Sequence, residues 1–177
     1  RRHILFIFIL HNIPYNMDAK SFTIEFTSLS DRIITDCGVC QAYIPGTNGV
    51  HPPVRTYKAL WDTGATKSSI SPKIASDLGL QYYKFTNVYH AKGHDLTKMY
   101  KVNLLLPNNV GFSCIPVLEG NLYGFDILIG MDIIMQGDFV ITNREGKTVC
   151  SFQIPSTHKY DFVKQNLNGV GQKKKKK

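Results

Sequence analysis

Short runs of alternating apolar and polar residues recur along most of the chain, and a period of two is typical of β-strands. Clusters of glycine, asparagine and proline separate these runs and predict tight turns. The expected strands cover residues 21–26, 32–43, 54–60, 87–91, 96–100, 100–106, 110–118, 127–129, 139–142 and 148–152. Three pairs of neighbouring strands are expected to form hairpins, with tips at 92–95, 107–109 and 143–146. The pattern therefore predicts a mainly β fold.

Two short segments depart from alternation and predict helical turns. Ser71 precedes a proline and is expected to cap a helix over residues 72–78, which would stop at Gly79. Residues 131–136 predict one or two further helical turns, closed by Gly137. The expected fold class is thus mainly β with one or two short helices.

Length and composition indicate one domain with two loosely organised ends. The 177 residues are 43% apolar and 19% charged, which suits a single core. We expect this domain to span residues 17–155. Residues 1–16 contain an apolar run at 4–10 behind two arginines, and they are interpreted as translated upstream sequence or a targeting leader. Residues 156–177 are interpreted as a flexible basic tail.

The net charge of +8 is concentrated at the two ends of the chain. Five lysines stand at 173–177 and two arginines at 1–2, so the rest of the chain has 14 basic against 13 acidic residues. A nucleic-acid-binding groove would carry its positive charge on the folded body, so binding of nucleic acid through the lysine tail is disfavoured. No membrane partner is expected, because the apolar run at 4–10 is far too short to span a bilayer.

Four cysteines raise the question of a metal site or of disulfides. Cys37 and Cys40 form a CxxC pair, but no second pair or HxxxH completes a tetrahedral zinc site. Cys114 and Cys150 stand alone. We therefore expect free, buried or half-buried thiols, no metal and no cofactor, and a reducing compartment such as the cytoplasm.

The chemical candidate is an acidic residue at the exit of a strand. The strand expected at 54–60 leads directly into Trp61-Asp62-Thr63-Gly64. A strand end holds a carboxylate rigidly, a glycine lets the backbone turn sharply, and a hydroxyl can lock the turn by a hydrogen bond. Later in the chain a second apolar run, 127–129, ends at Gly130.

Four elements in this order resemble the retropepsin-like aspartic proteases, most closely the retrotransposon-type forms. They are Asp62-Thr63-Gly64-Ala65, Ser69 to Ser71, Leu78-Gly79-Leu80 and Ile129-Gly130-Met131-Asp132. The resemblance covers about residues 54–154. It implies one half of a closed, retropepsin-like β-barrel that is completed by homodimerisation.

The resemblance also implies roles for single residues. The catalytic set would be Asp62, Thr63 and Gly64. In it Asp62 acts on water and substrate, Thr63 contacts the opposite subunit, and Gly64 shapes the turn. Ala65, Gly93, Ile129 and Gly130 would form the substrate-binding set. In this set Ala65 lines the cleft, the hairpin at Gly93 closes over a bound peptide, and Gly130, with Ile129 ahead of it, packs behind the catalytic loop. Asp126 and Asp132 are interpreted as structural.

A single Asp-Thr-Gly supplies half of an aspartic protease site, so the natural completion is a two-fold pair of chains. The strands at 139–142 and 148–152 are expected to carry that pairing. The sequence therefore predicts an aspartic endopeptidase that hydrolyses peptide bonds with a water activated by Asp62 of two subunits. The alternative is a catalytically silent domain of the same fold that serves interaction or assembly.

Overall fold

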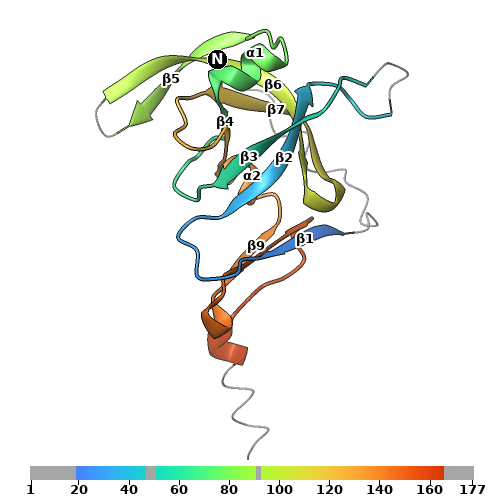
Figure 1. Cartoon of the computed structure of the whole chain (residues 1–177), viewed down its shortest axis with the longest axis vertical. Coiled ribbons are helices and arrows are strands. Elements are labelled where there is room, and N and C mark those ends of the chain that lie inside the picture. Colours follow the sequence, from blue (N-terminus) through green and yellow to red (C-terminus); the bar gives the residue numbers. More distant parts are fainter. Residues whose placement is uncertain (1–18, 47–50, 91–92, 166–177) are drawn as a thin grey trace, which may run out of the picture.

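Two β-sheets account for nearly half of the residues that the computed structural model describes, which are 19–46, 51–90 and 93–165 (Figure 1). The strands are β1 (Lys20–Glu25), β2 (Ile34–Gln41), β3 (Arg55–Trp61), β4 (Ser69–Ile70), β5 (Lys84–His90), β6 (Gly93–Leu106), β7 (Val110–Glu119), β8 (Ile127–Ile129), β9 (Asp138–Thr142) and β10 (Val149–Ile154). The helices are α1 (Pro72–Asp77), α2 (Met131–Ile134) and the 3-10 turns η1 (Pro107–Asn109) and η2 (Arg144–Gly146). The prediction of a mainly β fold with few short helices is confirmed.

The larger sheet closes on itself into a barrel. Its strands follow the order β2-β3-β8-β4-β7-β6-β5, and β2 also pairs with β6, so six strands form a closed ring. Closure leaves β5 as an extra strand that pairs with β6. Inside the ring, residues such as Val39, Ala59, Val102, Val117 and Ile127 are fully buried. The closed barrel of the expected fold is therefore present within one chain.

The smaller sheet has the order β1-β10-β9 and lies against the end of the barrel opposite the β5–β6 hairpin (Figure 1). Both pairings are antiparallel, so β10 is hydrogen-bonded on both sides. This corrects the expectation for residues 148–152: the last strand is the middle of the sheet and has no open edge for a second chain. The open edges of this sheet belong to β1 and β9.

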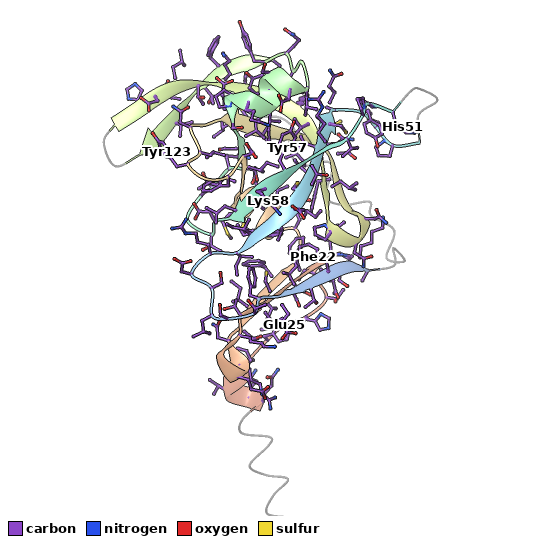
Figure 2. The ribbon with its side chains drawn as sticks, viewed as in Figure 1. Phe22, Glu25, His51, Tyr57, Lys58 and Tyr123 are labelled. Atoms are coloured by element: carbon purple, nitrogen blue, oxygen red, sulfur yellow. The ribbon has the colours of Figure 1, made fainter. Side chains whose placement is uncertain are left out.

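An aromatic cluster joins the smaller sheet to the barrel. The ring of Trp61, at the end of β3, stacks on Phe139 with centroids 5.1 Å apart and an interplanar angle of 5°. Phe152 lies 5.1 Å from the same indole and Phe22 lies 6.0 Å from it. Figure 2 shows Phe22 at the junction between β1 and the barrel above it. Because the indole N–H also donates to the buried Thr35 hydroxyl at 3.0 Å, Trp61 is fixed at both its apolar and its polar atoms.

Several boundaries differ from the predicted ones because strand pairing overrides local turn signals. β6 runs unbroken from Gly93 to Leu106, where the sequence suggested two strands. Tyr89 pairs with His94 and His90 with Gly93, so the first hairpin turns earlier than the predicted tip, and its remaining turn residues lie outside the described part. The two-residue strand β4 has no signal of its own in the sequence.

The chain stays attached to the fold beyond the expected boundary at residue 155. The Asp138 carboxylate accepts hydrogen bonds from the Ser156 hydroxyl and from the backbone N–H groups of Thr157, at 2.9 Å, and His158, at 3.0 Å. Burial alone would raise the pKa of Asp138, but these hydrogen bonds outweigh it and hold that pKa at about 2. Residues 162–165 then form a helical turn.

Truncation of the aromatic cluster is expected to destabilise the whole chain. Phe152 is fully buried and contacts the rings of both sheets. We expect Phe152→Ala to lower the free energy of unfolding by roughly 3–5 kcal/mol, measured by urea denaturation at fixed protein concentration. Leu29→Ala, at a side chain that is 63% exposed, is the control and should have a much smaller effect. Equal losses in the two variants would contradict this account.

Candidate functional site

Asp62 is placed by the pairing of two strands that are far apart in the sequence. β3 and β8 are parallel, with Trp61 opposite Ile129. One residue further on, the Asp62 N–H donates to the Ile129 carbonyl at 2.9 Å. The backbone that carries the carboxylate is therefore anchored to the barrel wall on the side away from solvent.

The residues that follow form a sharp turn around the carboxylate. The Gly64 N–H donates to Asp62 Oδ1 at 2.8 Å, and the Ala65 N–H donates to the Asp62 carbonyl at 3.3 Å. A Cβ atom at position 64 would lie 3.1 Å from Asp62 Oδ1, so a side chain there would crowd the carboxylate. Asp62 is half-buried, whereas Thr63 and Gly64 are exposed. The turn thus presents one oriented carboxyl group to solvent.

Gly130 supports this turn from behind through close backbone contact. A Cβ atom at position 130 would lie 2.7 Å from the carbonyl carbon of Lys67 and 2.9 Å from the carbonyl oxygen of Ala65. The Met131 N–H donates to that same Ala65 oxygen at 2.8 Å. Only glycine fits this approach, because every other residue would place an atom inside the loop of residues 62–68, hereafter the Asp62 loop.

A buried hydroxyl connects the Asp62 loop to the start of α2. Ser68 Oγ accepts a hydrogen bond from the Gly130 N–H at 3.0 Å and donates to Asp132 Oδ1 at 2.7 Å. The Ser68 N–H donates to the same Asp132 oxygen at 2.9 Å. The structural interpretation of Asp132 therefore fits, and its partner Ser68, which sequence reasoning missed, completes the network. The only available signal was a serine shortly after the Asp-Thr-Gly.

The second carboxylate oxygen of Asp132 is buried and makes no hydrogen bond among the described residues. Lys67 Nζ lies 4.0 Å from it, which is beyond hydrogen-bonding distance but close enough for an ion pair. The lysine side chain is half-exposed, so solvent weakens this attraction. The hydrogen bonds from Ser68 are therefore the stronger constraint on Asp132.

Asp62 and Thr63 lie on the wall of an open depression of about 390 Å³. Its apolar lining includes Phe125, Phe139 and Ile141, the last two from the edge strand β9. Asp31 is the other acidic residue in the lining, but its carboxylate is 88% exposed and is paired with Arg32 at 3.8 Å. One chain thus offers a single oriented carboxylate, beside an apolar surface.

The four residues of the expected substrate-binding set separate into two groups. Ala65 is partly exposed beside Asp62, and Gly93 is exposed at the end of the β5–β6 hairpin with φ +135°. Ile129 is fully buried and Gly130 is buried. This pair lies behind the Asp62 loop and supports it, which is the position that the resemblance implied for it.

The cysteines are free thiols, as expected. Cys37, Cys40 and Cys150 are buried, and burial raises the thiol pKa of each, to about 12 for Cys37 and about 11 for Cys150. These three thiols therefore stay protonated and unreactive at neutral pH.

In the described part of the chain, no group of three or more His, Cys, Asp or Glu side chains could hold a metal ion. Within the same residues, no helix is both long and apolar enough to cross a membrane.

The close contact at Gly130 gives a direct test of how the loop is held. Gly130→Ala would force the backbone of Lys67 and Ala65 away, and we expect a loss of roughly 1–3 kcal/mol in unfolding free energy. Gly120→Ala is a matched control, because its nearest heavy atoms would lie 3.6 Å from the new Cβ. Thermal or urea denaturation of both variants checks the prediction, and equal stability of the two would refute the packing argument.

Comparisons with known proteins concern both the sequence and the fold. Residues 54–136, which run from just before β3 to just after α2, match the family described as "gag-polyprotein putative aspartyl protease". No curated protein matches the chain. A retropepsin-like aspartic protease from Rickettsia conorii aligns over 78% of this chain and 98% of its own, with 15% identity and a TM-score of 0.45. The simian foamy virus (mac) protease aligns over 56% of this chain and 89% of its own, with 17% identity and a TM-score of 0.37.

The family match includes the Asp62 loop, the apolar strand β8 and Gly130. These are the parts whose contacts orient the Asp62 carboxylate. Over residues 54–136, slightly less than half of its length, the chain is therefore similar to the family of gag-polyprotein putative aspartyl proteases.

Proposed function

We propose that this protein is an aspartic endopeptidase whose active unit contains two copies of the chain, each contributing Asp62. The observation that carries the proposal is the way in which the Asp62 carboxylate is buried and hydrogen-bonded. It is half-buried at a strand exit, its backbone N–H is bonded to Ile129, and one of its oxygens accepts the Gly64 N–H. A carboxylate held this way needs no reorganisation before it acts on a substrate.

The chemistry follows from placing two such carboxyl groups face to face. Two carboxylates in close contact cannot both ionise cheaply, so they share one proton, which is the established behaviour of aspartic proteases. The ionised Asp62 takes a proton from water, and the protonated Asp62 donates to the carbonyl oxygen of the peptide bond. The water oxygen bonds to the carbonyl carbon. The bond to the leaving nitrogen then breaks as that nitrogen takes the proton that the first carboxylate removed from water, and a hydroxyl of the tetrahedral intermediate returns its proton to the second carboxylate. No metal, cofactor or covalent intermediate takes part in this scheme.

A second copy is the proposed source of the second carboxylate. The chain has one Asp-Thr-Gly, and Asp31, the other acid of the depression, is exposed and paired with Arg32. Thr63 is exposed beside Asp62, where it could grip the partner chain across a two-fold axis. Phe139 and Ile141 lie on the open edge strand β9 and line the same depression. Contact with the partner chain would remove these apolar side chains from water, which favours pairing.

The substrate is proposed to be a polypeptide bound in the cleft between the two Asp62 loops. Ala65 would line this cleft, and the β5–β6 hairpin that carries Gly93 would cover the bound chain. All four cysteines are free thiols, and the cytoplasm keeps thiols reduced. The free cysteines therefore favour a cytoplasmic location.

The catalytic role of Asp62 is tested by Asp62→Asn. Asparagine keeps the size of the side chain but cannot act as the proton-accepting base, so peptide cleavage should fall by at least about a thousandfold. Unfolding free energy and dimer formation should stay near wild-type values. The measurement is cleavage of a peptide library or an unfolded protein. The control is Asp77→Asn, at a partly exposed carboxylate that is paired with Lys73 and lies outside the Asp62 loop.

Mixing experiments then separate the dimeric mechanism from a monomeric one. Excess Asp62→Asn chains added to wild type should suppress activity, because mixed dimers contain one ionisable carboxyl group. Specific activity should also fall on dilution through the dimer dissociation constant. Activity per molecule that is unchanged in both experiments would exclude the shared site. A silent domain of the same fold would bind a partner but cleave nothing at any concentration.

The pH dependence of kcat/KM tests the shared proton. At low pH both Asp62 carboxyls are protonated and no base remains, while at high pH both are ionised and no acid remains. We expect a bell-shaped profile with its maximum on the acid side of neutrality. A rate that still rises through about pH 8 would instead point to a thiol or a metal-bound hydroxide.

A further inference from the structure

The β5–β6 hairpin leaves the barrel at a defined point. β6 pairs with β7 from Leu106 as far as Met99, which lies opposite Leu118. From Gly93 to Lys98, β6 pairs with β5 alone. Figure 1 shows this two-stranded part extending sideways from the top of the barrel. A two-stranded ribbon is marginally stable by itself, so its direction depends on what holds its root.

Glu119, the last residue of β7, contacts three residues of β6 at that root. Its Oε2 accepts the Tyr100 hydroxyl at 2.6 Å, and its Oε1 lies 3.3 Å from Lys98 Nζ. Its backbone carbonyl accepts the Thr97 hydroxyl at 2.7 Å. These contacts lie on both sides of Met99, where the β6–β7 pairing ends. One residue thus bridges the paired and the projecting parts of β6.

The surroundings make the Tyr100–Glu119 hydrogen bond the strongest of these contacts. Tyr100 is buried, with 3% of its surface exposed, and the Glu119 side chain is 19% exposed. Burial, and next the hydrogen bond to Glu119, raise the pKa of Tyr100 above its usual range, so the phenol stays a donor. Hydrogen bonds to a charged acceptor are shorter and stronger than neutral ones. The Lys98 contact is more exposed and is weakened by solvent.

The same residue is connected to the strand that follows the Asp62 loop. β4 begins at Ser69, directly after the loop, and pairs in parallel with β7, with Ile70 opposite Glu119. The Gly120 N–H donates to the Ile70 carbonyl at 2.9 Å. Glu119 therefore stands between the root of the hairpin and the backbone that leaves the Asp62 loop.

We propose that Glu119 is a positioning residue that fixes the direction in which the β5–β6 hairpin leaves the barrel, relative to the Asp62 loop. This inference rests on the proposed function in one respect: the hairpin must cover the bound peptide for its direction to affect catalysis. With Glu119 removed, the root loses the carboxylate that bridges Tyr100 and Lys98. The projecting strands then sample more directions, and fewer of them meet the substrate.

Hydrogen exchange of the free protein tests the anchoring without any substrate. In Glu119→Ala and in Tyr100→Phe, the amides of 84–88 and 93–98 should exchange on the order of tenfold faster, while those of β10 should not change. Glu25→Ala is the matched control, because Glu25, the last residue of β1, forms an ion pair at 3.0 Å with Lys147, which lies just before β10. Figure 2 places Glu25 far below the hairpin. Faster exchange in β10 as well, or no change in the hairpin, would overturn the proposal.

Peptide cleavage by the same variants provides the second measurement. KM should rise several-fold in Glu119→Ala with a smaller change in kcat, because the hairpin contacts substrate in both the bound and the transition state. Glu119→Gln keeps an acceptor for the Tyr100 hydroxyl and should restore most of the lost affinity. Loss of kcat with unchanged KM would count against positioning. If hairpin exchange increases as expected but wild type cleaves no peptide, the anchoring holds and the proposed function fails.

Discussion

The parallel pairing of β3 with β8 is the constraint on which the rest of the site depends. These strands are separated by more than sixty residues, and their pairing places Trp61 beside Ile129 and Asp62 directly beyond them. The connection between them contains the Asp62 loop, α1 and the strands that close the barrel. Parallel strands need such a crossover, so the orientation of the carboxylate depends on most of the barrel. Non-local pairing is therefore what makes the site rigid.

The Asp62 loop is held chiefly by backbone groups. Ile129 accepts the Asp62 N–H, Ala65 accepts the Met131 N–H, and the absence of a side chain at Gly130 permits both. Ser68 adds a buried hydroxyl that serves Gly130 and Asp132 together. Main-chain contacts leave the solvent side of the loop clear, so that Asp62 can meet a substrate and the second carboxylate of the proposed dimer. Such rigid placement of charged groups is a major source of rate enhancement in enzymes.

The two ends of the molecule differ in how firmly they are packed. At one end, Trp61, Phe139 and Phe152 pack the smaller sheet against the barrel, so the strand that carries Asp62 has a firm base. At the other end, the β5–β6 hairpin projects beyond the barrel and is anchored at its root by Glu119. Firm packing below the carboxylate and a narrow attachment for the hairpin suit the proposed peptidase site, in which Asp62 stays fixed while a peptide enters.

The sequence by itself determined the fold class, most strands, both helices and the carboxylate that follows a buried strand. Alternation and turn residues are local signals, and they sufficed for these features. Tertiary structure alone decided the partners: β10 in the middle of its sheet, Ser68 against Asp132, and Glu119 at the root of the hairpin. A period of two tells which face of a strand is buried but not which strand lies beside it. Each of these contacts joins residues far apart in the chain, or depends on the strand order that brings them together, and only the closed barrel fixes that order.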